Sequence, residues 1–166
     1  MEELSYEMQQ VNATLSHIRQ VQELLCTCIT DLNRRATDHD KSKFCDDEWL
    51  YFLTHTKTLA GLTYGSPEYK EALEEMRPAI ENHYIRNRHH PEHHTAWIRD
   101  MNLIDLLEMI CDWIAATKRH SDGDIFKSIE LNQKRFNYSF ELKAIFENTV
   151  REITRSTDSN ESQLSS

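Results

Sequence analysis

The consecutive residues His39 and Asp40, in the stretch HDKSKF at 39–44, are the first candidates for chemistry in this chain. An imidazole and a carboxylate on consecutive residues point in different directions on a regular helix or strand. They can converge on one point where a helix ends and the backbone turns. A divalent metal ion that accepts one nitrogen and one oxygen ligand would use such a pair.

A second group of candidates is a run of histidines further along the chain. Within twelve residues the sequence places His83, His89, His90, His93 and His94. Such density is uncommon in a packed domain, and charged side chains surround it. One interpretation is a set of metal ligands or phosphate donors, and the other is a solvated polar loop.

Two more candidates lie on segments with helical periodicity. His17 shares a predicted helix face with Val21, Leu24 and Cys28, so its side chain is expected to point inward. Asp112 lies among apolar neighbours on a later helix, so its carboxylate is expected to be partly buried. A partly buried acid needs a partner, and a metal ion would serve. The competing interpretations are a core histidine with a local hydrogen bond and an acid on a solvated face.

The order of these candidates resembles the HD-domain superfamily of metal-dependent phosphohydrolases. In that family a histidine on one helix precedes a His-Asp pair, often further histidines, and an aspartate on a later helix. The stretch 39–43 is similar to the family's His-Asp-x-Gly-Lys motif, with Ser42 in the glycine position. The stretch from about Leu15 to Ala116 is also similar to a phage and bacterial family of unknown function with HD-like motifs, through HDKSKF, NRHHPEHH and LIDLLEMICDWIAA. The resemblance implies a metal site formed by His17, His39, Asp40 and Asp112.

The resemblance also implies a function. We expect a divalent-metal-dependent phosphohydrolase that cleaves the phosphate ester of a nucleotide or cyclic nucleotide with a metal-activated water. Two nitrogen and two oxygen ligands leave open positions on octahedral Mn²⁺, Fe²⁺, Co²⁺, Ni²⁺ or Mg²⁺. One ion or two would fit, and a second ion would be held by His83, His90 and His94.

The remaining site residues follow from the charge that phosphoryl transfer requires near the non-bridging oxygens. Lys43, three residues after Asp40, is the first candidate, so Asp40 and Lys43 are the predicted catalytic residues. HD-type nucleotidases that place an acid at this position differ from the chain here, which leaves phosphomonoester and phosphodiester hydrolysis both open. Substrate binding is assigned to Arg86, Arg88 and His89.

Composition and periodicity predict the fold that positions these residues. The chain has 166 residues with only three glycines and three prolines, which favours one all-α domain. We expect a single-domain, HD-domain-like bundle of about five to seven helices over residues 1–155, and a disordered tail over 156–166. Ser66 and Pro67 are typical of a helix start, and Pro78 predicts a break near Arg77. The longest predicted helix, from about Glu3 to Ala36, carries apolar residues at three- and four-residue steps: Val11, Leu15, Ile18, Leu25, Ile29 and Leu32.

Charge and cysteine content exclude several classes. The formal charge of −9 argues against binding of duplex nucleic acid, which needs a basic face. No apolar run is long enough to cross a bilayer, so no membrane partner is expected. The four cysteines lack zinc-binding spacing and are typical of reduced thiols in a cytoplasmic protein. The expected partner is a small phosphate ester, and a homo-oligomer is left open.

Two other functional classes compete with an enzyme. One is a helical module that binds metal and nucleotide without catalysis and regulates or sequesters a ligand or partner. The other is a helical interaction protein in which the histidines are incidental. The second of these predicts no stoichiometric metal.

Overall fold

The structure, a computed structural model, describes residues 5–62, 66–119 and 123–164, and all of its regular elements there are helices. The predicted all-α fold with up to seven α-helices is confirmed. The chain divides into two compact units, residues 1–39 and residues 40–166, where the sequence predicts one domain over 1–155. None of the helices in the described ranges combines the length and the apolar character needed to span a bilayer.

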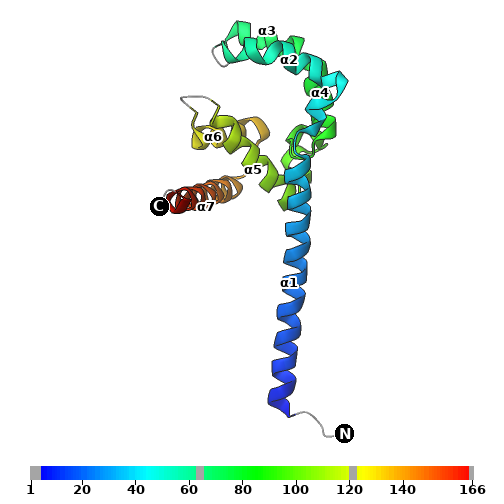
Figure 1. Cartoon of the computed structure of the whole chain (residues 1–166), viewed down its shortest axis with the longest axis vertical. Helices are drawn as coiled ribbons and strands as arrows, with labels where there is room; N and C mark the ends of the chain where they lie inside the picture. The colour runs from blue at the N-terminus through cyan, green and yellow to red at the C-terminus, as the bar shows by residue number, and fades with distance from the viewer. Residues whose placement is uncertain (1–4, 63–65, 120–122, 165–166) are drawn as a thin grey trace. The chain divides into compact units, whose positions relative to one another are not determined.

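The first unit is one unbroken helix, α1, which spans Tyr6–Asp38 (Figure 1). Ser5 caps its start by accepting a hydrogen bond from the amide of Met8 at 3.3 Å. No glycine or proline interrupts the segment, which is why it runs for 33 residues without a kink.

The second unit contains the remaining helices, and three of them are short 3-10 turns labelled η. In chain order they are η1 (Lys41–Phe44), α2 (Asp46–Ala60), α3 (Pro67–Glu75), α4 (Arg77–Arg86), η2 (Pro91–His93), η3 (Trp97–Asp100), α5 (Leu103–Thr117), α6 (Ile125–Phe136) and α7 (Phe140–Leu164).

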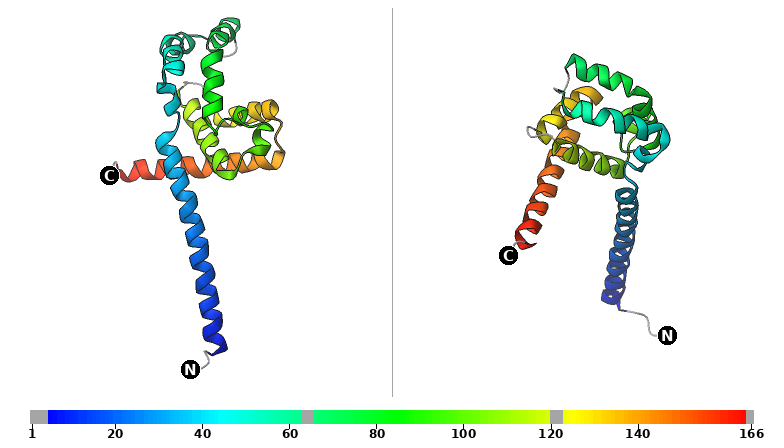
Figure 2. Two further views of the ribbon diagram at one scale, coloured as in Figure 1. Left: turned by 90° about the vertical axis from the view of Figure 1, so that its right-hand side faces the viewer. Right: turned by 45° about the horizontal axis from the view of Figure 1, so that its top comes forward.

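The hydrophobic core of the second unit lies where α5, α6 and α7 meet, with η3 packed beside them. Figure 2 shows α6 and α7 running side by side, in yellow and in orange to red. The core side chains include Met109, Ile110 and Ile129, each at most 1% exposed. Tyr138, in the connection between α6 and α7, donates its hydroxyl to the carbonyl of Ile129 on α6 at 2.6 Å. This layer holds α5 in place, and α5 carries two acids of the candidate site.

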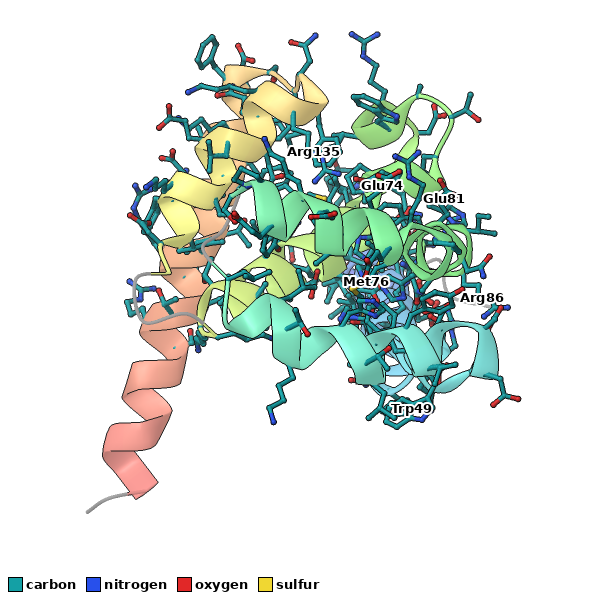
Figure 3. All side chains as sticks on the ribbon, turned by 90° about the horizontal axis from the view of Figure 1, so that it is seen from above. Trp49, Glu74, Met76, Glu81, Arg86 and Arg135 are labelled. Atoms are coloured by element: carbon teal, nitrogen blue, oxygen red, sulfur yellow. The ribbon has the colours of Figure 1, made fainter. Side chains whose placement is uncertain are left out.

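A second layer consists of α2, α3 and α4. The break predicted near Arg77 is confirmed, because α3 ends at Glu75 and α4 begins at Arg77 with its proline in the first turn. On α2, Trp49 points away from α3 and α4 and is 43% exposed (Figure 3), whereas its neighbour Glu48 is fully buried. The buried face of α2 is therefore directed at α4, which carries the first histidine of the cluster.

The end of the chain differs from the prediction. The sequence predicts disorder from residue 156, but α7 continues to Leu164, and residues 165 and 166 lie outside the described part of the chain. The segment contains no glycine or proline that would end the helix. Ser156 also donates its hydroxyl to the carbonyl of Glu152 at 2.9 Å, so its polar side chain is satisfied within the helix.

Candidate metal centre

Asp40 enters the site through an unusual backbone conformation. Its φ of 56° places it in the left-handed region, where Asp and Asn are the side chains that occur most readily after glycine. Its carbonyl accepts the amide of Lys43 at 3.0 Å, which starts η1. The Lys43 ammonium pairs with Oδ2 of Asp40, so Oδ1 is the carboxylate oxygen that faces the histidines.

His83 lies in the last turn of α4, with its side chain only 5% exposed. Its Nε2 is 3.1 Å from Asp40 Oδ1, and its Nδ1 is 2.9 Å from Oε2 of the buried Glu48. Ser42 donates its hydroxyl to the same Glu48 oxygen at 3.0 Å. Since a carboxylate can only accept, Nδ1 of His83 donates to Glu48, and Nε2 is the nitrogen directed toward Asp40.

His89 and His90 reach the site because α4 stops and the chain turns back. Asn87, which follows α4, donates its amide to the carbonyl of His83 and to the hydroxyl of Ser42, both at 2.7 Å. His89 then places Nε2 3.5 Å from Asp40 Oδ1 and Nδ1 3.2 Å from Oε1 of Glu108 on α5. Each of His83 and His89 therefore has one nitrogen on a glutamate and the other toward Asp40.

The four residues Asp40, His83, His89 and His90 converge on one point. One donor atom from each lies within 4.8 Å of the others. Among the described residues, Nε2 of His83 and Nε2 of His90 make no hydrogen bond although both are buried. The 3.1 Å distance from His83 Nε2 to Asp40 Oδ1 is short, but its direction is not that of a hydrogen bond. Buried donors and acceptors are normally satisfied, and a metal ion would satisfy these two.

The electrostatics favour a neutral imidazole at His90. Burial, together with the neighbouring His89 and His83, lowers the pKa of His90 to about 3, against the opposing effect of Asp112 and Asp40. A neutral ring offers the lone pair that a metal ion requires. Three imidazole nitrogens and one carboxylate oxygen form a donor set that suits Zn²⁺, Mn²⁺, Fe²⁺, Co²⁺ or Ni²⁺. The glutamates on Nδ1 match the carboxylate–histidine–metal arrangement common in metalloproteins.

His17 differs most from the prediction. Its side chain is exposed on α1. It precedes His39 by 22 positions on one unbroken helix, which corresponds to about 33 Å along the axis. One ion cannot bind both, so the prediction that His17 and His39 share an ion is wrong. Helical periodicity indicated which residues share a face with His17 but not what that face contacts.

The two remaining predicted ligands are His39 and Asp112. His39 is the last residue of the first unit, directly before Asp40 in the chain, and its role as a ligand stays a prediction. Asp112, on α5, is half-buried and has a carboxylate oxygen within 4.8 Å of one of Asp40. Of the four predicted ligands, Asp40 therefore lies in the cluster with the three histidines, and the carboxylate of Asp112 lies next to that of Asp40.

The predicted substrate-binding arginines are held by carboxylates. Arg86, at the outer edge of the second unit (Figure 3), makes two hydrogen bonds to Asp47 at 2.8 and 2.6 Å and one to Glu48 at 3.2 Å. Arg88 binds the fully buried Asp105 through two nitrogens, at 3.2 and 2.9 Å. Both guanidinium groups are therefore held in ion pairs with carboxylates, and their role in substrate binding stays a prediction.

The other predicted assignments also change in part. His94 does not join His83 and His90 in a second site, because its Nε2 lies 2.9 Å from the carbonyl oxygen of Arg88. His89, predicted to bind substrate, is buried among the candidate ligands instead. Lys43, predicted to face a phosphoryl group, pairs with Asp40 and lies over the Phe52 ring at 5.4 Å.

Sequence reasoning missed the two glutamates. In the sequence Glu48 is one of three consecutive acids at 46–48, and Glu108 lies one helical turn before Asp112, so neither stands out as a partner for a histidine. The signal that could have found them is their place on helices with apolar neighbours, combined with an excess of histidines that needed acceptors. Nothing in the sequence pairs a given glutamate with a given histidine, because the partners are 35 and 19 positions apart.

Residues 6–157 match a protein family described as a family of unknown function (DUF5662). Comparison with curated proteins and with solved structures found no match. The family description names no activity, ligand or cofactor.

Proposed function

The chain belongs to the family of unknown function DUF5662, and from the geometry of its own site we propose that it is a divalent-metal-dependent phosphohydrolase. The ion would be held by Asp40, His83, His89 and His90. The observation that carries this proposal is the convergence of their four donor atoms within 4.8 Å, with the far nitrogens of two histidines on buried or nearly buried glutamates. A solvated polar loop would have no need of such an arrangement.

The bound ion would supply an activated water and a positive charge for phosphate oxygens. The side chains of the protein orient the ligands of the ion. Glu48 and Glu108 orient the two imidazoles, and Lys43 holds the second oxygen of Asp40. Asp112 adds a carboxylate beside Asp40 that can serve as a further donor or accept a proton. The substrate class, a nucleotide or cyclic nucleotide, rests on the resemblance to HD-domain enzymes.

A second candidate is a metal- and nucleotide-binding module without catalysis. It is favoured by one observation: the three cations expected to meet the phosphate, Lys43, Arg86 and Arg88, each pair with a carboxylate. In a catalytic site at least one of them would have to exchange that carboxylate for substrate. The two candidates share the metal centre and differ in turnover.

The first test is elemental analysis of tag-free protein. We expect about one divalent ion per chain in the wild type and a clear loss in His83→Ala and His90→Ala. His94→Ala is the matched control, since it removes the same side chain from the same segment outside the centre. Equal metal content in all four proteins would refute the assignment of the ligands.

The second test measures turnover with protein shown to hold metal. Mononucleotides, cyclic nucleotides and a generic aryl phosphodiester would be tested with Mn²⁺, Co²⁺, Ni²⁺ and Mg²⁺. Hydrolysis that is lost in His90→Ala and kept in His94→Ala supports the enzyme. No hydrolysis in any combination, together with saturable nucleotide binding, favours the non-catalytic module.

A further inference from the structure

One face of α1 carries apolar residues in strict alternation of three- and four-residue steps. We call this set the α1 stripe: Met8, Val11, Leu15, Ile18, Gln22, Leu25, Ile29 and Leu32. Its mean spacing of 3.5 residues is the a and d pattern of a heptad repeat, which imposes a supercoil on a pair of helices. Gln22 is the only polar member.

The α1 stripe is exposed from Met8 to Ile29, and its last member, Leu32, is half-buried. Leu15 and Ile18 are each 44% exposed, Val11 and Ile29 each 55%, and Leu25 57%. A contiguous apolar surface of this length marks an interaction site. Packing of an amphipathic face, rather than intrinsic propensity, supplies most of the stability of a helix in a protein. A helix of this length with an exposed stripe therefore needs a partner.

The positions beside the stripe suit a second copy of the same helix. Between residues 8 and 32 the flanking e and g positions carry one charge, on Arg19; they are Asn12, Thr14, Arg19, Val21, Cys26 and Cys28. Two chains with a formal charge of −9 each can therefore meet here without facing like charges. The opposite face is mainly polar and contains Gln20, Thr27 and Arg34.

The length of α1 also favours a helical partner. Its 33 residues extend about 50 Å at 1.5 Å per residue. A compact unit of about 127 residues has a radius of gyration of about 14 Å and a diameter of about 36 Å. The stripe from Met8 to Leu32 extends about 36 Å. A rounded unit of that diameter touches a straight helix over only part of this length, whereas a second helix covers the whole stripe.

We propose that α1 forms a parallel, in-register coiled coil with α1 of a second copy of this chain. Parallel register places the Gln22 amides of the two copies against one another, where they hydrogen-bond, as a polar residue at an a position does when it sets register. It also keeps the two Arg19 side chains apart, since an e position faces a g position in a parallel pair. Antiparallel pairing would bury each Gln22 against Ile18.

The experiment is the mass of the full, tag-free chain in solution, by light scattering after size exclusion. The wild type is expected at twice 19.7 kDa. Leu15→Glu, which places a charge in the stripe, is expected at 19.7 kDa. Gln20→Glu, which places the same charge on the polar face, is expected to stay dimeric. A wild type of 19.7 kDa at the concentrations used for structural work overturns the proposal.

A second variant separates loss of the interface from loss of folding. Gln22→Leu removes the polar residue from the stripe and is expected to lower the dimer dissociation constant at least tenfold, because polar a residues cost stability. An improved interface cannot result from misfolding. An unchanged or weaker dimer in Gln22→Leu, or a dimer that Leu15→Glu leaves intact, would also overturn the proposal.

Discussion

Replacing Glu48 by glutamine tests the centre at a residue that would not touch the ion. Glu48 is fully buried and accepts from His83 Nδ1 at 2.9 Å, from Ser42 at 3.0 Å and from Arg86 at 3.2 Å. Glutamine has the same shape but offers an amide nitrogen in place of one of the two oxygens. In one orientation that nitrogen faces Nδ1 of His83, and the ring can no longer donate there.

The loss of the hydrogen bond from His83 sets the expected decrease in metal affinity. A carboxylate that orients a ligating histidine typically contributes a factor of about 10 to 100 in metal affinity. We therefore expect the dissociation constant for Mn²⁺ or Zn²⁺ to rise by about that factor in Glu48→Gln, which corresponds to about 1.4 to 2.7 kcal/mol. The apo protein should also lose about 1 to 3 kcal/mol of stability, because a buried donor is left unsatisfied.

Asp47→Asn is the matched control. Asp47 is the neighbouring acid, is 44% exposed and binds the same Arg86, but it makes no contact with His83 in the described structure. Metal affinity would be measured by titration calorimetry and apo stability by thermal melting. If Glu48→Gln binds metal as tightly as the wild type, or if Asp47→Asn weakens binding equally, the orienting role of Glu48 is refuted.

Three further predictions concern metal coupling, the core and Lys43. Metal at a hundred times its dissociation constant should stabilise the wild type by at most about 2.7 kcal/mol, the value for metal that binds the native state alone. In a melt with and without chelator, Asp112→Asn should respond less to metal, and its apo form should melt slightly higher, since a like charge near Asp40 is gone. Tyr138→Phe should cost about 1 kcal/mol in thermal or denaturant unfolding through the lost hydrogen bond to Ile129. Burial raises the pKa of Tyr138, so its contribution is complete below about pH 10 and is lost as the pH rises further, a loss that the phenylalanine variant should not show. Lys43→Ala should leave metal content unchanged in elemental analysis and lower turnover; loss of the ion would show that Lys43 is needed to hold Asp40.

The helices were predictable because their signals are local. Ser66 accepts the amide of Tyr69 at 3.1 Å, as its place before Pro67 indicates, and Pro78 separates α3 from α4 as expected. The division into two units was not predictable, because periodicity shows that α1 has an apolar face and does not show what covers it. The polar composition of residues 156–166 predicts disorder, whereas α7 continues to Leu164.

The site was predictable in its residue types and not in its pairing. The density of histidines at 83–94 indicated either metal ligands or phosphate donors on the one hand, or a solvated polar loop on the other. Asp40 lies at a turn after a helix, as predicted. The grouping of Asp40 with His83, His89 and His90 depends on where α4 ends, at Arg86, and on the turn that Asn87 fixes. Asn87 is held by Ser42, which lies 45 positions away, so local signals do not show this turn.

Three of the four candidate ligands come from one eight-residue segment, His83 to His90, whereas Asp40 lies 43 positions before it. The local segment needs no folding to gather its imidazoles, since closing so short a loop costs little entropy. If the centre binds an ion as proposed, the denatured chain would chelate it as well, and that binding would subtract from the stabilisation of the native state. As metal concentration rises, the melting temperature should climb and then level off. The height of that plateau reports the ratio of the metal affinities of the native and the denatured chain. That ratio is the gain in affinity that Asp40 and the fixed orientations of the imidazole rings provide.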